Sequence, residues 1–234
     1  LLSPVLDDFN AIAKLVPWAF EQVDYNVFAD FREKEVSEKP VNYWEITEKN
    51  QLKSVKGANL KGRNLNNADM YKAFLVKADF RNASLKGANL YKANLQEADL
   101  YDANLQEAKL FYANLQQAIL MKAELQKANL KTADLQLANL ILAELQEAEL
   151  NNANLQQAYL MNANLQQTNL LGANLQDAYF TYADLTGAKN LTIEQLSRVK
   201  TLYQAKLDPE LLEQVKNCCP HLLEEPKEET DKTK

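Results

Sequence analysis

The chain has 234 residues, 47% of them apolar, and carries a formal net charge of −6. This composition suits one domain with a buried core, and no apolar run reaches the roughly 18–20 residues that a membrane span needs. With a single histidine and two adjacent cysteines, the sequence has no metal-binding framework. We therefore expect neither a cofactor nor a bound metal.

Residues 1–55 predict an N-terminal helical cap followed by a connector. Ser3 and Pro4 suit the N-cap and the first position of a helix, and apolar residues follow at helical spacing. Trp44 and Ile46 are expected to cover the first unit of the domain that follows, because a stacked repeat exposes core side chains at its open end.

A five-residue repeat runs from residue 56 to residue 190. Leu, or Val, Met or Phe in its place, recurs at every fifth position from 55 to 185, and Ala lies two residues before it at nearly every step. Five residues advance a helix by about 140°, and an odd period sends successive strand side chains to opposite faces. These side chains share one interior only if the chain turns a corner after each repeat. Four sides then close a coil of about twenty residues, which predicts about seven stacked coils with Ala and Leu inside.

The glycines have a fixed place in this repeat. Gly57, Gly62, Gly87, Gly172 and Gly187 all lie two residues after the Leu position. We expect this position to be the corner, where glycine adopts a positive φ most easily.

The sequence GANLYKANLQEADLYDANLQEAKL at 87–110 resembles the pentapeptide-repeat family, whose unit is written A(D/N)LXX. The resemblance covers more than half of the chain. It implies an all-β solenoid, a right-handed quadrilateral β-helix, and we expect α-helical caps at both of its ends. The layout of Phe28–Trp44 followed by KGANLKGRNL is similar to the segment that joins membrane helices to repeats in some cyanobacterial members. A membrane attachment would then require a segment upstream of Leu1.

Residues 191–222 predict a C-terminal helical cap. Thr192 and Gln195 fit a capping box for a helix over 193–206, and Asp208–Pro209 fits the start of a second helix.

The end of the chain carries Cys218 and Cys219, followed by a polar tail at 223–234 that we expect to be disordered. Adjacent cysteines rarely close a comfortable ring, so we interpret them as free or buried thiols, with an inter-chain disulfide as the alternative.

Glutamine marks two of the four expected faces, because it follows the Leu position at every tenth residue. Gln96, Gln116, Gln136, Gln156 and Gln176 share one face, and Gln106, Gln126, Gln146 and Gln166 share the opposite one. We expect the amides to hydrogen-bond from coil to coil and stabilise the column. Contact with a polymer or with another solenoid is the alternative interpretation.

Large apolar residues gather on a third face, at outward positions of the repeat. The candidate partner-binding residues there are Tyr101, Ile119, Met121, Ile141, Leu142, Tyr159, Met161, Tyr179 and Tyr182. Aromatic residues and Met are typical of interface centres, so a partner or dimer contact is one interpretation, and cross-strand stacking without a partner is the other. The face opposite carries Tyr71, Tyr91, Phe111, Tyr112 and Leu171.

Charge bears on the best-known function of the family, the mimicry of DNA by proteins that protect a type II topoisomerase. Between residues 56 and 190 there are thirteen Lys and Arg and thirteen Asp and Glu, so the repeats are neutral in total. A DNA mimic requires a strongly acidic column, which disfavours this function, and nucleic-acid binding is not expected because the basic residues form no continuous groove.

The sequence therefore predicts a non-catalytic scaffold that binds an unidentified protein, or a second copy of itself, through an outer face. The topoisomerase-binding DNA mimic and the soluble domain of a membrane-anchored protein are the alternatives. The compartment stays open, with the cytoplasm weighed ahead of thylakoid, periplasmic or membrane-attached locations.

Overall fold

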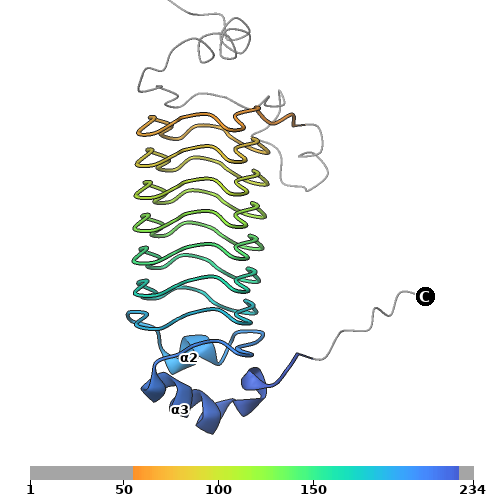
Figure 1. The fold of residues 1–234 in the computed structure, drawn as a ribbon, viewed down its shortest axis with the longest axis vertical. Coiled ribbons are helices and arrows are strands. Elements are labelled where there is room, and N and C mark those ends of the chain that lie inside the picture. Colours follow the sequence, from red (N-terminus) through yellow and green to blue (C-terminus); the bar gives the residue numbers. More distant parts are fainter. Residues whose placement is uncertain (1–54, 227–234) are drawn as a thin grey trace, which may run out of the picture.

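The computed structural model of the chain describes residues 55–226, which form a column of stacked coils with short helices at its C-terminal end (Figure 1). Parallel bridges join residues twenty positions apart, from Asn59 and Asp79 to Asn169 and Lys189. This register is that of a β-helical solenoid with four repeats per coil. The N-terminal cap expected within 1–54 lies outside the described residues, and so does the chain beyond residue 226. No helix of the described part is long and apolar enough to cross a membrane.

A repeat with Asn or Asp before the Leu position satisfies its five backbone N–H groups in a fixed way, which residues 78–82 illustrate. One N–H closes the turn, one pairs with the preceding coil, and two pair with the following coil. The remaining N–H, that of Arg81, donates to no backbone carbonyl of the ladder. The Asp79 carboxylate accepts it at 3.1 Å. Asn or Asp before the Leu position is therefore an Asx turn built into the motif.

The last residue of each repeat forms the corner and has a positive φ. Non-glycine residues occupy this position from Asn67 (φ 56°) to Tyr182 (φ 60°), among them Lys, Glu, Gln and Leu side chains. Gly62, Gly87, Gly172 and Gly187 share the conformation, as expected. Gly57 has no such φ, and its reason is close approach, because a Cβ there would lie 1.7 Å from the Lys77 carbonyl oxygen.

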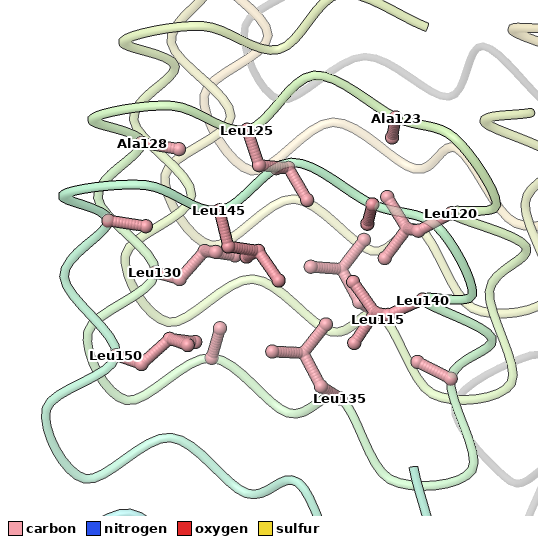
Figure 2. Close-up of a cluster of buried hydrophobic side chains, with 14 of the residues drawn as sticks. Leu115, Leu120, Ala123, Leu125, Ala128, Leu130, Leu135, Leu140, Leu145 and Leu150 are labelled. Carbon is pink, nitrogen blue, oxygen red and sulfur yellow. The ribbon is translucent and has the colours of Figure 1, made fainter. Parts of the chain in front are cut away.

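The interior consists of stacked Ala and Leu side chains that are almost fully buried (Figure 2). Met70, Phe80 and Phe180 replace Leu without leaving the core. Thr168 occupies an Ala position, and its hydroxyl donates to the Leu145 carbonyl at 2.9 Å. Val55 is the exception to the sequence pattern. It lies in a separate buried cluster with Phe74 and Val76, whose side chains flank an inward Leu from the outward positions.

The first C-terminal helix is shorter than predicted. Helix α2 (Ile193–Leu196) begins with the expected capping box of Thr192 and Gln195 but has four residues. A helix over 193–206 is wrong, because residues 197–207 rejoin the column. Bridges join Tyr179 to Thr201 and Asp184 to Lys206, an offset of twenty-two residues, so two extra residues are accommodated at α2.

Two more short elements pack under the last coil. Helix α3 (Pro209–Cys218) starts at Pro209 as predicted, and the 3-10 helix η3 (Pro220–Leu223) follows it. Val215 and Leu222 of these elements are buried in the same core as the column. The Leu202 N–H donates to the Leu222 carbonyl at 2.7 Å, which ties η3 to the ladder.

Cys218 and Cys219 are bonded to each other in a disulfide, with an S–S distance of 2.09 Å. The expectation of free thiols, or of a bond between chains, is wrong for this pair. The bond lies where α3 ends, and the side chain of Cys219 is buried in the core while Cys218 is exposed.

Candidate interaction surface

The four sides of the coil are numbered in chain order by the residue that follows the inward Leu position. Face 1 carries Gln96 and the residues twenty apart from it, face 2 carries Tyr101 and its series, face 3 Gln106, and face 4 Phe111. The nine candidate partner-binding residues all lie on face 2, and we call them the apolar stripe. Ile119, Leu142, Tyr159 and Tyr182 are exposed, and the other five are half-buried.

The backbone ladder holds the apolar stripe in register. Bridges link Ile119 to Asn139, Tyr159 and Tyr179 in successive coils. The rings of Tyr159 and Tyr179 stack with centroids 5.1 Å apart. Side chains on a face of this kind are held by their backbone before any partner arrives.

Tyr203 extends the stripe by one coil. The sequence prediction of a helix over 193–206 leaves this residue out of the stripe. Its ring lies 5.7 Å from that of Tyr182 in an edge-on contact. The signal was present, since YQAKL at 203–207 has the same form as YKANL at 91–95.

The other end of the stripe carries a cation. Lys122 lies 5.6 Å from the centre of the Tyr101 ring, and a hydrogen bond with Tyr101 is the main reason that its pKa is raised. Between Asn139 and Tyr182, in contrast, the nine outward positions of face 2 hold no charged residue. These positions are Asn139, Ile141, Leu142, Tyr159, Met161, Asn162, Tyr179, Thr181 and Tyr182.

The stripe also changes the hydrogen bonding of its own backbone. Ile119, Tyr159 and Tyr179 stand where the motif has Asn or Asp, so the Asx acceptor is missing. Within the described chain, the N–H groups of Met121, Met161 and Thr181 accordingly donate no hydrogen bond. Ile141 keeps its bond, because Asn139 accepts it at 3.2 Å.

The glutamines of faces 1 and 3 behave differently from the expectation. Three of their side-chain amides donate to carboxylates of the following coil: Gln106 to Glu124 at 3.1 Å, Gln116 to Asp134 at 2.6 Å and Gln166 to Asp184 at 3.0 Å. Gln146 donates to Glu144 of its own repeat. Among residues 55–226 no side-chain bond joins one Gln to another, so the predicted amide ladder is wrong. The role expected for these residues, stabilisation from coil to coil, is performed by Gln–carboxylate pairs.

Face 4 holds an aromatic cluster that closes on itself. Tyr71 and Tyr91 stack with centroids 5.4 Å apart and an interplanar angle of 1°. Phe111 packs against Tyr112 at 4.3 Å, and Lys92 lies over the rings of Tyr91 and Tyr112. These contacts match the interpretation of cross-strand stacking.

Two carboxylates have lowered pKa values. Asp79 accepts hydrogen bonds from the Arg81 guanidinium, at 2.8 and 2.6 Å, and this is the largest cause of its shift. Burial raises the pKa of Asp184, but hydrogen bonds from Thr186, Gln166 and Lys206 together outweigh burial and lower it. Both groups act within the column, and no cluster of three or more possible metal ligands lies in the described part of the chain.

The family follows from a comparison with known protein families. A model described as pentapeptide repeats matches the chain over 55–87, 64–100, 98–136, 123–160 and 158–189, which is more than half of its length. The chain belongs to the pentapeptide-repeat family. No curated protein matches it.

Several solved pentapeptide-repeat proteins and QnrB1, described as a plasmid-mediated fluoroquinolone resistance protein, are similar to this chain. QnrB1 is 18% identical with a TM-score of 0.50, over 68% of this chain and 95% of that one, which shows a shared fold alone. HetL, a pentapeptide-repeat protein involved in heterocyst differentiation regulation in the cyanobacterium Nostoc sp. strain PCC 7120, is 25% identical over 82% and 89% of the two chains, with a TM-score of 0.37. Rfr23 of the cyanobacterium Cyanothece 51142 is 32% identical over 49% and 82%, with a TM-score of 0.32.

An open depression of about 490 Å³, which the sequence did not indicate, lies at the C-terminal end of the column of this pentapeptide-repeat protein. Leu171, Asn174 and the start of α2 line it. Its charged lining residues, Glu194 and Arg198, pair with each other at 2.7 Å.

Proposed function

We propose that this pentapeptide-repeat protein is a non-catalytic scaffold that binds a protein partner through the apolar stripe. The observation that carries the proposal is the run of nine outward positions without charge, of which Leu142, Tyr159 and Tyr182 are exposed apolar or aromatic residues. Exposed apolar surface of this kind, rich in Tyr and Met, is typical of the centre of a protein interface.

Binding occurs by rigid display. The Leu and Ala interior fixes the backbone, and the ladder sets the side chains of successive coils at about 4.8 Å. A partner then orders few main-chain groups on this side of the contact, which lowers the entropic cost of association.

The column is taken to be right-handed, with about seven coils and a cap at each end. At the C-terminal end, α2, α3 and η3 would stop the ladder from pairing with another chain, since Leu196, Val215 and Leu222 occupy the core below the last coil. At the N-terminal end we assign the same capping role to residues before Val55.

Charged substitutions on the stripe test the function. Ile141→Asp or Met161→Asp is expected to abolish association while leaving the thermal unfolding temperature of the column nearly unchanged, because both side chains point outward. Gln136→Asp and Gln156→Asp are matched controls at the same repeat position on face 1, in the same stretch of the column. Pull-down from native lysate and sedimentation report the result. Equal capture by all four variants would rule out the stripe as the binding surface.

Topoisomerase binding is the alternative from a different functional class, and the neutral repeats disfavour it. A supercoiling assay with a type II topoisomerase separates the two proposals. We expect no inhibition and no protection from quinolones. Inhibition or quinolone protection that persists in the Ile141→Asp variant would show that a surface other than the stripe is the functional one.

A further inference from the structure

We propose that the partner of the apolar stripe is a second copy of this chain, bound antiparallel about a twofold axis. The inference rests on the proposed function and names its partner. In a twofold interface each copy presents the same patch, so the patch must be complementary to itself. Charge allows the stripe to meet this condition and argues against face 3, and the stripe also carries the hydrogen-bond donors and acceptors that such a contact needs.

The charge pattern allows face 2 to meet itself. The nine positions from Asn139 to Tyr182 are uncharged, so no like charges would face each other across the axis. Face 3 presents Glu124 and Glu144 in successive coils. Two copies that met through face 3 would bring these carboxylates together.

Hydrogen bonding supplies the second condition. Met161 and Thr181 have backbone N–H groups that donate to no group of the described chain. The same face carries oxygen acceptors, namely the exposed Asn162 amide and the Tyr159 and Tyr179 hydroxyls. Antiparallel pairing centred on the coil of Met161 lets donors of one copy face acceptors of the other.

Other positions that lack Asn or Asp differ from the stripe in their side chains. Glu124 and Glu149 also replace the Asx acceptor, and within the described residues the N–H groups of Gln126 and Asn151 donate no hydrogen bond either. The two carboxylates nevertheless bind other coils, since Glu124 accepts from Asn104 at 2.9 Å and Glu149 accepts from Asn169 at 3.0 Å. Ile119 forms no such polar contact and is 38% exposed, so the stripe presents an apolar group where the other faces form a hydrogen bond between coils.

The C-terminal segment of the chain fits the stripe poorly. The residues after Pro226 are KEETDKTK, which have no apolar side chain to place there.

The length of the stripe sets the expected strength. About the coil of Met161, the contact can extend from Met121 to Tyr203, which is four coil spacings, or about 19 Å at about 4.8 Å each. This is a small contact for a protein dimer, and we expect a dimer that dissociates on dilution in the micromolar range.

Sedimentation of the full chain over a range of concentrations, combined with small-angle X-ray scattering, tests the proposal. We expect a concentration-dependent dimer whose longest dimension is that of the monomer, since the columns lie side by side. Met161→Asp is expected to raise the dissociation constant at least tenfold, and Gln156→Asp to leave it unchanged. A monomer at every concentration, or an end-to-end dimer that Met161→Asp does not affect, would overturn the proposal.

Crosslinking gives a second readout that survives a small loss of affinity. Asn162→Cys on face 2 and Asn152→Cys on face 4 are matched, because both residues are exposed corner residues, with φ 57° and 56°. The two natural cysteines are bonded to each other and leave no competing thiol. A short bis-maleimide should join two copies through Asn162→Cys only, and equal products from both variants would contradict the twofold contact. A monomer that still captures another protein through Ile141 would sink this inference and leave the proposed function standing.

Discussion

Faces 2 and 3 are built by the same repeat on the same backbone, yet they use their outward positions in opposite ways. On face 3, Gln106 and Gln166 donate to carboxylates of the following coil. On face 2, Ile119 and Leu142 reach outward and are 38% and 43% exposed. The polar side chains of face 3 form hydrogen bonds between coils, whereas these two apolar side chains of face 2 form none.

The difference teaches that the fold does not require the apolar stripe. A column of this type is stable with polar outward residues, as face 3 demonstrates over the same coils. Residues that weaken the backbone network and expose apolar surface are therefore candidates for a role outside folding. We expect the two faces to differ in their outward side chains and not in the packing beneath them.

The largest effect is expected in the interior that both faces share. Leu140→Ala, beneath face 2, and Leu145→Ala, beneath face 3, should each lower the free energy of unfolding by about 2–5 kcal/mol, because each leaves a cavity in a close-packed core. Both side chains are shown in Figure 2 and are at most 1% exposed. Chemical denaturation measures the change. A large loss under only one of the faces would show that the two sides differ in packing as well as in surface.

A smaller effect should separate the outer surfaces. Glu124→Ala on face 3 removes the acceptor of Asn104 and Gln106 and is expected to cost about 1–2 kcal/mol. Ile119→Ala on face 2 should change stability by about 0.5 kcal/mol or less, since its side chain accepts no such bond. Denaturation of the two single variants gives the comparison, and equal costs would argue against it.

Restoring Asn at the motif position on face 2 should raise the free energy of unfolding instead of lowering it. Ile119→Asn supplies the missing acceptor for the Met121 N–H, and we expect the free energy of unfolding to rise by about 0.5–1 kcal/mol. Thermal unfolding measures it at a concentration where the chain is monomeric. If the variant is less stable than the natural chain by more than this amount, the Ile119 side chain stabilises the column, and the missing acceptor for the Met121 N–H costs no stability.

The smallest effect is the acid response, to which Asp184 on face 3 should contribute. The pKa of Asp184 is lower in the folded chain than its usual value of 3.8, so the folded state binds fewer protons than the unfolded one. Its contribution is complete above the unfolded pKa and is lost as the pH falls through the lower, folded pKa. Unfolding curves between neutral pH and strong acid should therefore show less acid destabilisation for Asp184→Asn, with no such change for Met161→Gln on face 2.

Much of this architecture could be predicted from the sequence because one constraint repeats. The period of five sorts Leu and Ala inward, and the nine stripe residues fall on one face by arithmetic alone. The N-terminal prediction, including Trp44 and Ile46, lies outside the described residues and stays a prediction.

Other features depend on contacts that a period does not encode. Helical spacing relates Ile193, Leu196, Val199 and Leu202, but the backbone at 201–202 pairs with other segments. Thr201 bridges to Tyr179 of the preceding coil, and the Leu202 N–H donates to the Leu222 carbonyl. Gln106 and Gln116 pair with carboxylates eighteen residues away, and which carboxylate lies opposite is fixed only by the coil. The bond between Cys218 and Cys219 depends on the local turn between α3 and η3.

Photo-crosslinking from all four faces of one stretch of the column tests the central claim most directly. Gln136, Ile141, Gln146 and Asn151 occupy the same repeat position on faces 1, 2, 3 and 4. Each is replaced in turn by a photoreactive residue in the full chain, and crosslinked products are analysed in the native cell. The account predicts a protein product from position 141 and background from the other three. Products of equal yield from all four positions, or a product from position 146 and none from 141, would contradict it.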